Sequence, residues 1–388
     1  MDRLYLDYNA TAPLRPVVRE AIIDVLAKVG NASSVHAEGR EARRLVETAR
    51  RQVAALVGGD ARLVTFTSGG TEANNTVLTP DWRSGGHPHR ADFLVTGATE
   101  HASVLAGGRF PEDRVRTIPV DGNGLLRLDS LERILEGLAA EEGRPLVSVM
   151  LANNETGVIQ PVAEIAALAH RAGAIIHTDA VQAAGRIPVD IAALGVDVLT
   201  LSAHKIGGPQ GAGAIVRASE ALTFAPLIRG GGQEKRLRAG TENVAGLVGF
   251  GAAAEAALAD LPMAESWSAW RDRIADAIAA SASKVTVFGG GAPRLPQTLC
   301  IGVDGVPAET LVIALDLEGV AVSSGSACSS GKVSPSHVLA AMGVQEKAAK
   351  TGIRLSLGWE SGESTLDLFA KRWARVLKHV APGHVRAA

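Results

Sequence analysis

Short apolar runs alternate with helical patterns along the first two thirds of the chain. Hydrophobic residues recur at helical spacing in VVREAIIDVLAKV, which begins at Val17, and again from Ala42 to Leu56. Between such stretches lie short runs rich in Val, Ile, Leu and Thr, namely LVTFTS, DFLVTG, PLVSVMLAN, AIIHTDA and VLTLSAHK. Buried strands of a parallel sheet have this composition, because helices cover both faces of the sheet. The pattern therefore predicts an α/β fold.

Polar or glycine-rich segments follow the ends of these predicted strands. They read SGGTEANN, TEHAS, NNETG, TDAVQ and SAHK. Ligands of α/β sheets collect at the carboxyl ends of the strands, so we expect one crevice to gather all five segments.

The pattern changes in the last third of the chain. A long helix from Ala264 to Ala282 is followed by a strand-like VTVFG and by a loop rich in glycine and serine near residue 325. We expect a large domain of residues 13–260 and a smaller domain formed by residues 1–12 and 261–388.

Charge and cysteine content exclude several classes of function. The 39 basic and 41 acidic residues are interspersed, which disfavours nucleic acid and anionic membranes as partners and favours small-molecule chemistry. The only cysteines, Cys300 and Cys328, lie far apart, which fits a reducing compartment and leaves no paired spacing for a structural metal. The stretch from Val244 is interrupted by Glu255 and is predicted to be a buried helix, not a membrane span. With no signal peptide visible, we expect a cytoplasmic protein.

Lys205 is the first candidate for chemistry. It lies in SAHKIGGPQGAGAIVR, after the apolar run VDVLTL and before a glycine-rich turn. A lysine that forms a Schiff base must be partly neutral, and burial lowers a lysine pKa by up to roughly 3 to 5 units. A lone loop lysine is more often solvated. The neighbouring segments argue against a solvated loop lysine and favour a lysine that carries pyridoxal phosphate.

Those segments supply the other groups that pyridoxal phosphate needs. Asp179 ends a predicted strand one βα unit before Lys205, and a carboxylate there would raise the pKa of the pyridine nitrogen. Taken alone, Asp179 is equally well interpreted as a helix N-cap. SGGTEANN offers glycines, Thr71 and a helix start to a phosphate, without the spacing of a dinucleotide or nucleoside triphosphate motif. GGGQEKRLRAGTEN is a second such loop, with cations and Thr241.

Two further side chains have chemistry of their own. His101, in TEHAS, is suited to stacking on the cofactor ring and moving protons, although a strand-end histidine bonded to backbone is as good a reading. Cys328 lies in VSSGSACSSGKVSPSHV, where Gly, Ser and Pro predict a mobile surface loop. A thiol there is nucleophilic, and Lys332 or His337 would increase its thiolate fraction. Cys300 is predicted to be a buried hydrophobic residue.

Together the motifs resemble those of the cysteine desulfurases, the NifS/IscS-like branch of the class V pyridoxal-phosphate aminotransferases. They are, in order, LDYNATAP, TSGGTEANN, TEHASV, LANNETGVIQPV, HTDAVQ, SAHKIGGPQGAG and RAGTENVAG, followed by SSGSACSSG. The resemblance extends from YLDYNATAP to IRLSLG, nearly the whole chain. It implies pyridoxal-phosphate fold type I, with a mostly parallel seven-stranded sheet in the large domain and a smaller α/β domain.

The resemblance also implies roles for individual residues. Lys205 would carry the cofactor, with Asp179 at the pyridine nitrogen, Gln182 at the phenolic oxygen and His101 above the ring. The phosphate would be held by Gly70, Thr71, Ser202 and His204, and by Thr241 of the neighbouring subunit in a symmetric dimer. Asn154 would contact the cofactor and, with the planar fork of Arg354, bind the substrate carboxylate.

The reaction implied is the conversion of L-cysteine to L-alanine, with the sulfur left as a persulfide on Cys328. An acceptor protein, such as an iron–sulfur scaffold, would then take the sulfur. Two alternatives stay open at this stage. One is another aminotransferase or lyase of the same fold, in which Cys328 is incidental, and the other is a non-catalytic protein of sulfur relay.

Overall fold

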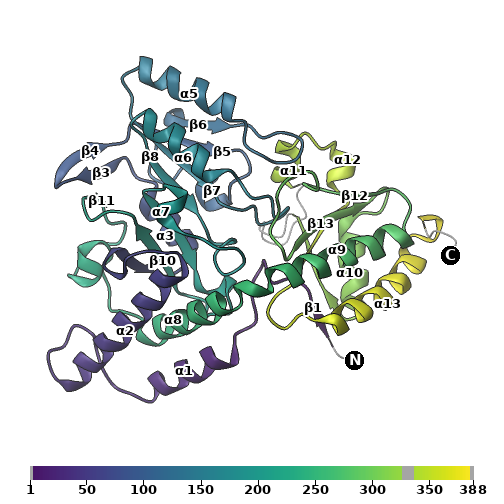
Figure 1. Ribbon diagram of the computed structural model, residues 1–388, viewed down its shortest axis with the longest axis horizontal. Coiled ribbons are helices and arrows are strands. Elements are labelled where there is room, and N and C mark those ends of the chain that lie inside the picture. The colour runs from purple at the N-terminus through teal and green to yellow at the C-terminus, as the bar shows by residue number, and fades with distance from the viewer. Residues whose placement is uncertain (1–2, 326–335, 385–388) are drawn as a thin grey trace.

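The larger lobe of the molecule is built on a seven-stranded sheet (Figure 1). The computed structural model describes residues 3–325 and 336–384, so Cys328 lies outside the described residues. In sheet order the strands are β2 (Val64–Thr67), β10 (Gly213–Arg217), β9 (Val198–Ser202), β8 (Ile175–Asp179), β7 (Pro145–Met150), β5 (Phe93–Gly97) and β6 (Val115–Ile118). Neighbours are parallel except at β10, which is antiparallel to β2 and β9. The prediction of a mostly parallel seven-stranded sheet is confirmed.

Both faces of this sheet are buried, which explains why its strands are continuous apolar runs. Side chains of a strand alternate between the two faces. On one face lie Leu94, Leu146, Ile175, Val198 and Ile215. Their neighbours in the chain, Val95, Val147, Ile176, Leu199 and Val216, belong to the core on the opposite face. Each strand therefore contributes to two cores at once.

Helices cover the two faces. Their bounds are α1 (Pro16–Leu26), α2 (Ala37–Leu56), α3 (Gly70–Val77), α4 (Ala102–Leu105), α5 (Leu128–Ala140), α6 (Val162–Arg171), α7 (Ile191–Leu194) and α8 (Val244–Ala259). Helix α8 packs against α1 and α2. It is rich in glycine and alanine, and these small residues allow its backbone to lie close to that of α2. A Cβ at Gly251 would lie 2.6 Å from Cα of Ala49. The prediction of a buried helix from Val244 is confirmed.

Two strands of the central sheet and a small outer sheet were not apparent from the sequence. β6 is a short, partly exposed edge strand, and β10 lies in the stretch that also contains Lys205. The outer sheet consists of β11 (Leu222–Phe224), β3 (Asp81–Ser84) and β4 (His87–Arg90). β6 and the strands of the outer sheet are short and contain polar residues, so they show little apolar periodicity. β10 is buried and mostly apolar, but it has only five residues and directly follows a glycine-rich segment.

The smaller lobe holds a four-stranded antiparallel sheet in the order β12-β13-β16-β15. Its elements are α9 (Ala264–Ser281), β12 (Val285–Val287), β13 (Thr298–Val303), α10 (Ala308–Leu317), β14 (Val320–Ala321), β15 (Ser323–Ser324), α11 (His337–Ala341), α12 (Glu346–Ala349), β16 (Gly352–Ser356) and α13 (Glu363–Val380). The amino-terminal strand β1 (Leu4–Tyr5) lies in this lobe (Figure 1) and pairs in parallel with β14. Among the described residues, no single helix is long and apolar enough to cross a bilayer. Only α8 and the adjoining segment Leu261–Ser281, taken together, reach that length and composition, and the pair is bent by 48°.

The smaller lobe has a core of its own. Leu4 and Leu6 pack there with residues between Ile274 and Ala381. Cys300 and the start of α11, by contrast, belong to the core of the larger lobe. Packing thus crosses the predicted boundary near residue 260, and the limits of the two domains stay a prediction.

Candidate active site

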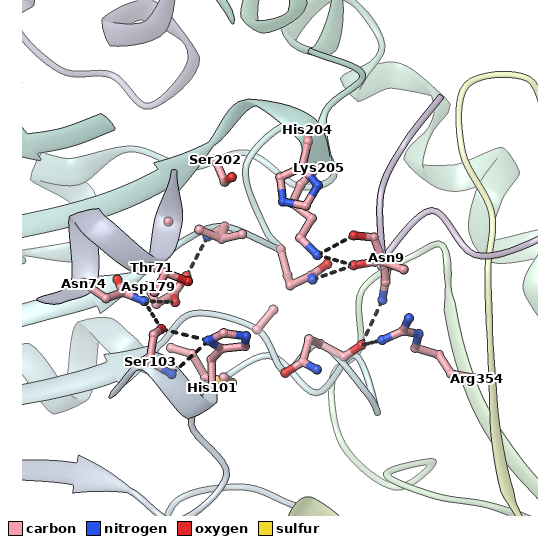
Figure 2. Close-up of a pocket in the computed structure, with 17 residues that line it drawn as sticks. Asn9, Thr71, Asn74, His101, Ser103, Asp179, Ser202, His204, Lys205 and Arg354 are labelled. Carbon is pink, nitrogen blue, oxygen red and sulfur yellow. Dashed lines mark hydrogen bonds between the residues drawn. The ribbon is translucent and has the colours of Figure 1, made fainter. Parts of the chain in front are cut away.

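A cavity of about 310 Å³ lies where the parallel strands end (Figure 2). Ten of the residues predicted from the sequence line it, namely Gly70, Thr71, His101, Asn154, Asp179, Gln182, Ser202, His204, Lys205 and Arg354. They come from the carboxyl ends of β8 and β9, from the segments that follow β2, β5, β7, β8 and β9, and from β16 of the smaller lobe. The expected crevice is therefore formed, because parallel strands bring their carboxyl ends to one edge.

Lys205 lies in a short 3-10 turn, Ala203–Lys205, that directly follows β9. Its Nζ donates to the carbonyl oxygens of Asn9, at 2.6 Å, and Ala10, at 2.9 Å. The amino-terminal segment thus passes beside the lysine, and Figure 2 shows the amine directed toward Asn9. This places the amine inside the cavity, half-buried, and not in solvent.

Asp179 is the last residue of β8 and is buried. One carboxylate oxygen accepts from the backbone N–H of Val181 at 3.0 Å, and the other accepts from the Asn74 amide at 2.7 Å. The alternative interpretation as a helix N-cap is wrong, since the next helix begins only at Ile191. The carboxylate is instead held in the wall of the cavity.

His101 both caps a helix and lines the cavity. Its Nδ1 accepts from the Ser103 backbone N–H at 3.1 Å at the start of α4, and lies 2.8 Å from the Ser103 hydroxyl. Burial lowers the pKa of His101 below 6.5; the carboxylate of Asp179 opposes this, and Lys205 and His337 add to it. The two interpretations made from sequence are thus not exclusive, because one ring nitrogen bonds to the helix start while the ring faces the cavity.

Three of the predicted phosphate residues lie at the amino terminus of α3: Gly70 and Thr71 are its first two residues, and a Cβ on Gly70 would lie 3.6 Å from Cβ of Ser202. Gly69, just before the helix, has φ of 156°, a conformation that favours glycine. A Cβ on Gly213 of β10 would lie 2.6 Å from backbone atoms of Gly69, so the turn packs directly on the sheet. His204 lies on another wall, where burial and then Lys205 lower its pKa to about 4, which keeps it neutral.

Thr241 is an exception among the predicted binding residues. It is exposed and is not part of the cavity lining. Its predicted contact is with a neighbouring subunit, and that role stays a prediction. Cys328 also stays a prediction, because it lies outside the described residues.

Arg354 comes from the middle of β16 and connects the lobes. It is buried, and its guanidinium donates to a carboxylate oxygen of Asp7 at 2.7 Å and to the carbonyl oxygen of Asn154 at 3.0 Å. Its Nε is buried without a hydrogen-bond partner among the described residues. A buried cation with an unpaired N–H at a cavity wall is suited to a carboxylate ligand.

Glu155 is a second buried group at the junction of the lobes, next to Asn154. It accepts from the Ser336 hydroxyl at 2.5 Å. Burial raises its pKa to about 7, although the Ser336 hydrogen bond and the charge of Arg354 both lower it. Sequence reasoning did not single out Glu155, and its only signal was its position inside the NNETG motif.

The structure reveals four more residues that sequence reasoning missed. The carbonyl oxygen of Asn9 accepts from the Lys205 amine, and the Asn74 side chain donates to Asp179. The Ser103 hydroxyl is hydrogen-bonded to His101, and Asp7 forms an ion pair with Arg354. Asn74 lies four residues after Gly70, one helical turn along α3, so helical spacing would place both on one face. Asp7 and Asn9 lie in LDYNATAP, a motif whose only signal in the sequence is its resemblance to the cysteine desulfurases.

The donor set fits pyridoxal phosphate. One cavity presents an amine, a buried carboxylate and the amino terminus of a helix in a tight glycine turn, which are the groups that such a cofactor needs for covalent attachment, for its ring nitrogen and for its phosphate.

Comparison with known proteins points the same way. Residues 4–369 match the family model for class V aminotransferases. The chain is 44% identical to the cysteine desulfurase of Cereibacter sphaeroides, covering 95% of this chain and 94% of that protein, and 39% identical to cysteine desulfurase IscS of Dictyoglomus turgidum, covering 98% and 96%.

Solved structures are similar as well. A NifS-like protein from Rickettsia africae has a TM-score of 0.86 and 34% sequence identity, and the match covers 97% of this chain and 100% of that one. A structure described as SspA in complex with cysteine has a TM-score of 0.74 and 27% identity, over 92% and 99%.

Proposed function

The chain belongs to the class V aminotransferase family, and on that premise we propose that it acts as a cysteine desulfurase with pyridoxal phosphate as its cofactor. It converts L-cysteine to L-alanine and leaves the sulfur as a persulfide on Cys328. The observation that carries this proposal is that Lys205, Asp179, His101 and Arg354 line one cavity.

Each wall of the cavity has a distinct task. Lys205 would attach the cofactor, Asp179 would interact with its ring nitrogen, and the start of α3 with Ser202 and His204 would hold its phosphate. When bound, pyridoxal phosphate supplies an electron sink that weakens bonds at Cα and Cβ of an amino acid. The buried position of the Asp179 carboxylate supports this assignment, since it favours the protonated ring.

The contact that selects an amino acid lies at the junction of the lobes. Arg354 and Asn154 bind the substrate carboxylate, with the guanidinium already oriented by Asp7. Cys328 supplies the thiolate that attacks the substrate sulfur. The Cβ–S bond then breaks, its electron pair stays with the carbon, and protonation of that carbon gives alanine.

The partners and location follow from the same premise. The enzyme is a symmetric dimer in which Thr241 of each subunit contributes to the phosphate site of the other. Its substrate is L-cysteine, and a sulfur-acceptor protein, such as an iron–sulfur scaffold, removes the persulfide sulfur. The balanced charge of the chain supports small-molecule chemistry rather than binding of nucleic acid, and the two widely separated cysteines support a reducing, cytoplasmic location.

The Cys328→Ala variant tests the proposal. We expect it to retain the visible absorbance of the bound cofactor and to lose production of alanine and sulfide. Cys300→Ala is the matched control, because Cys300 is fully buried and burial raises its thiol pKa. That variant should keep turnover.

Two outcomes would overturn the proposal. Normal turnover of L-cysteine by Cys328→Ala would make Cys328 incidental and would favour another aminotransferase or lyase of this fold. Absence of a cofactor absorbance band in the purified protein, even after pyridoxal phosphate is added, would favour a non-catalytic role in sulfur relay.

A further inference from the structure

A continuous set of buried hydrogen bonds connects Asp179 to His101 through Asn74. We name it the Asn74 relay; it comprises Ser148, His177, Thr200, Asn74, Asp179, Ser103 and His101. The residues come from β7, β8, β9, α3, α4 and the position before α4. The relay therefore extends from the interior of the sheet into the cavity wall, where Asn74, Asp179, Ser103 and His101 lie. All but His101 are less than a tenth exposed.

The orientation of the Asn74 amide is determined by its neighbours. Its Oδ1 accepts from the Thr200 hydroxyl at 2.6 Å, and its Nδ2 donates to Asp179 at 2.7 Å and to the Ser103 hydroxyl oxygen at 3.0 Å. With the amide reversed, its oxygen would face the Asp179 carboxylate, and two acceptors would meet without a hydrogen. Only the first orientation satisfies every group.

This orientation dictates where the proton of His101 lies. The Ser103 hydroxyl oxygen accepts from Asn74, and among the described residues the only acceptor within reach of its own hydrogen is His101 Nδ1, 2.8 Å away. The Ser103 backbone N–H also donates to that nitrogen, at 3.1 Å. Nδ1 is therefore an acceptor, and the neutral ring carries its proton on Nε2, on the side of the ring that faces the cavity in Figure 2.

The donors and acceptors at the other end of the Asn74 relay, from Thr200 to Ser148, are determined as well. Thr200 uses its hydrogen on Asn74, so it accepts from His177 Nε2 at 3.1 Å, and His177 Nδ1 accepts from Ser148 at 2.8 Å. Burial lowers the pKa of His177 to about 3, so that ring is neutral at any pH at which an enzyme of this kind works. A change of pH near neutrality does not reverse the relay from this end.

We propose that Asn74 is a positioning residue that ties the Asp179 carboxylate to His101 and fixes the proton of His101 on Nε2. His101 therefore presents an N–H donor to the cavity and does not act as a base in its resting form. The proposal rests on the proposed function only in treating His101 and Asp179 as site residues.

The charged surroundings of His101 agree with this assignment. An imidazolium would need a proton on Nδ1, where two donors already point. Three titratable groups act on the ring from other elements: Asp179 of β8 favours its charged form, whereas Lys205 after β9 and His337 of α11 disfavour it. Burial, the largest influence, also lowers the pKa of His101.

The tautomer is directly measurable. Nitrogen-15 NMR of cofactor-loaded protein labelled in histidine distinguishes the two ring nitrogens, and His101→Gln identifies the His101 signals. At neutral pH we expect a protonated Nε2 and an unprotonated Nδ1. A signal of the Nδ1–H tautomer, or of imidazolium, would overturn the proposal. This readout needs no turnover, so it stands or falls independently of the Cys328→Ala test.

A matched pair of variants tests the relay itself. Thr200→Val removes the hydroxyl that orients Asn74, and Thr178→Val removes an equally buried hydroxyl, which donates to the Val149 carbonyl at 2.7 Å outside the relay. We expect Thr200→Val to produce a mixture of His101 tautomers and to lower kcat for L-cysteine at least about tenfold with little change in KM. Thr178→Val should leave the tautomer unchanged.

Rescue completes the test. Thr200→Ser keeps the hydroxyl and should restore both the single tautomer and kcat. Equal effects of Thr200→Val and Thr178→Val, or an unchanged tautomer in folded Thr200→Val, would show that Asn74 does not control the proton of His101.

Discussion

The two lobes contribute to the cavity in different ways. The larger lobe supplies backbone turns and side chains at the ends of strands, such as Asp179, the last residue of β8, and Lys205, in the turn that follows β9. The smaller lobe supplies Arg354 from the interior of β16, oriented by an ion pair with Asp7 and a hydrogen bond to Asn154. The residues of the larger lobe are positioned by the ends of its strands. Arg354 is positioned by polar contacts at the junction of the two lobes. Changes in the larger lobe should therefore affect the cofactor, and changes in the smaller lobe the substrate.

The largest expected effect is at the centre of the larger lobe. Lys205→Ala removes the attachment point of the cofactor, and we expect L-cysteine turnover to fall at least about a thousandfold. The absorbance band of lysine-bound cofactor should disappear as well. Steady-state assays of alanine and visible spectra measure both effects.

Lys347→Ala is the control, because Lys347 is exposed on α12 of the smaller lobe. It should leave the spectrum and turnover unchanged. Retention of the band in Lys205→Ala would mean that the larger lobe does not attach the cofactor through this residue, and the contrast between the lobes would be lost.

The junction of the lobes should show the next largest effect, as a dependence of stability on pH. The buried Glu155 carboxyl has its pKa raised from 4.5 to about 7 in the folded protein. As pH rises, the unfolded chain loses this proton at a lower pH than the folded protein does. The contribution of Glu155 to the free energy of unfolding is therefore full below pH 4.5 and is lost as pH rises to about 7. The loss is about 3 kcal/mol, in proportion to the shift.

Glu155→Gln should remove this loss, because the amide does not ionise. Urea unfolding at pH 5 and pH 8 would show a smaller decrease in the variant than in the unaltered protein, and the exposed Glu141→Gln would behave like the latter. An identical decrease in Glu155→Gln would show that the carboxyl is already solvated, and the tie between the lobes would be weaker than the geometry indicates.

The same contrast explains what sequence reasoning could predict. Apolar runs followed by polar segments revealed five strands and most of the cavity, because parallel strands place their trailing residues at one edge. Arg354 lies in a buried strand and was reached only through the family resemblance. Asn74 and Ser103 depend on which strands are neighbours, and β5 and β2 lie at opposite sides of the sheet order. Periodicity does not encode that order.

A third prediction concerns the glycine turn that precedes α3. Gly213→Ala would place a Cβ 2.6 Å from the Gly69 backbone, and backbone cannot move as a flexible side chain does. We expect a loss of about 1–3 kcal/mol in unfolding free energy and weaker cofactor binding. Spectral titration with pyridoxal phosphate and urea unfolding measure the two effects.

Gly137→Ala is the control for this variant. Gly137 lies in helix α5 with nothing within 4 Å of its Cβ position, so alanine should stabilise the protein slightly and leave cofactor affinity unchanged. If Gly213→Ala binds the cofactor normally, the close packing of this turn is not what shapes the phosphate site.

The smallest effect is expected in the core of the smaller lobe, and it separates stability from the site. Trp373 stacks on Phe369, with ring centroids 5.9 Å apart, and its indole N–H donates to the Ser281 hydroxyl at 2.8 Å. Trp373→Phe removes that hydrogen bond and part of the buried surface, at a cost of about 1–2 kcal/mol. Because no strand end of the larger lobe is involved, the cofactor spectrum and kcat should not change below the unfolding transition.

Ser281→Ala removes the same bond from the other partner and should give a similar loss. A change in the cofactor spectrum in either variant would mean that the core of the smaller lobe also shapes the cofactor site, whereas a rise in KM alone would show that this core supports the position of Arg354.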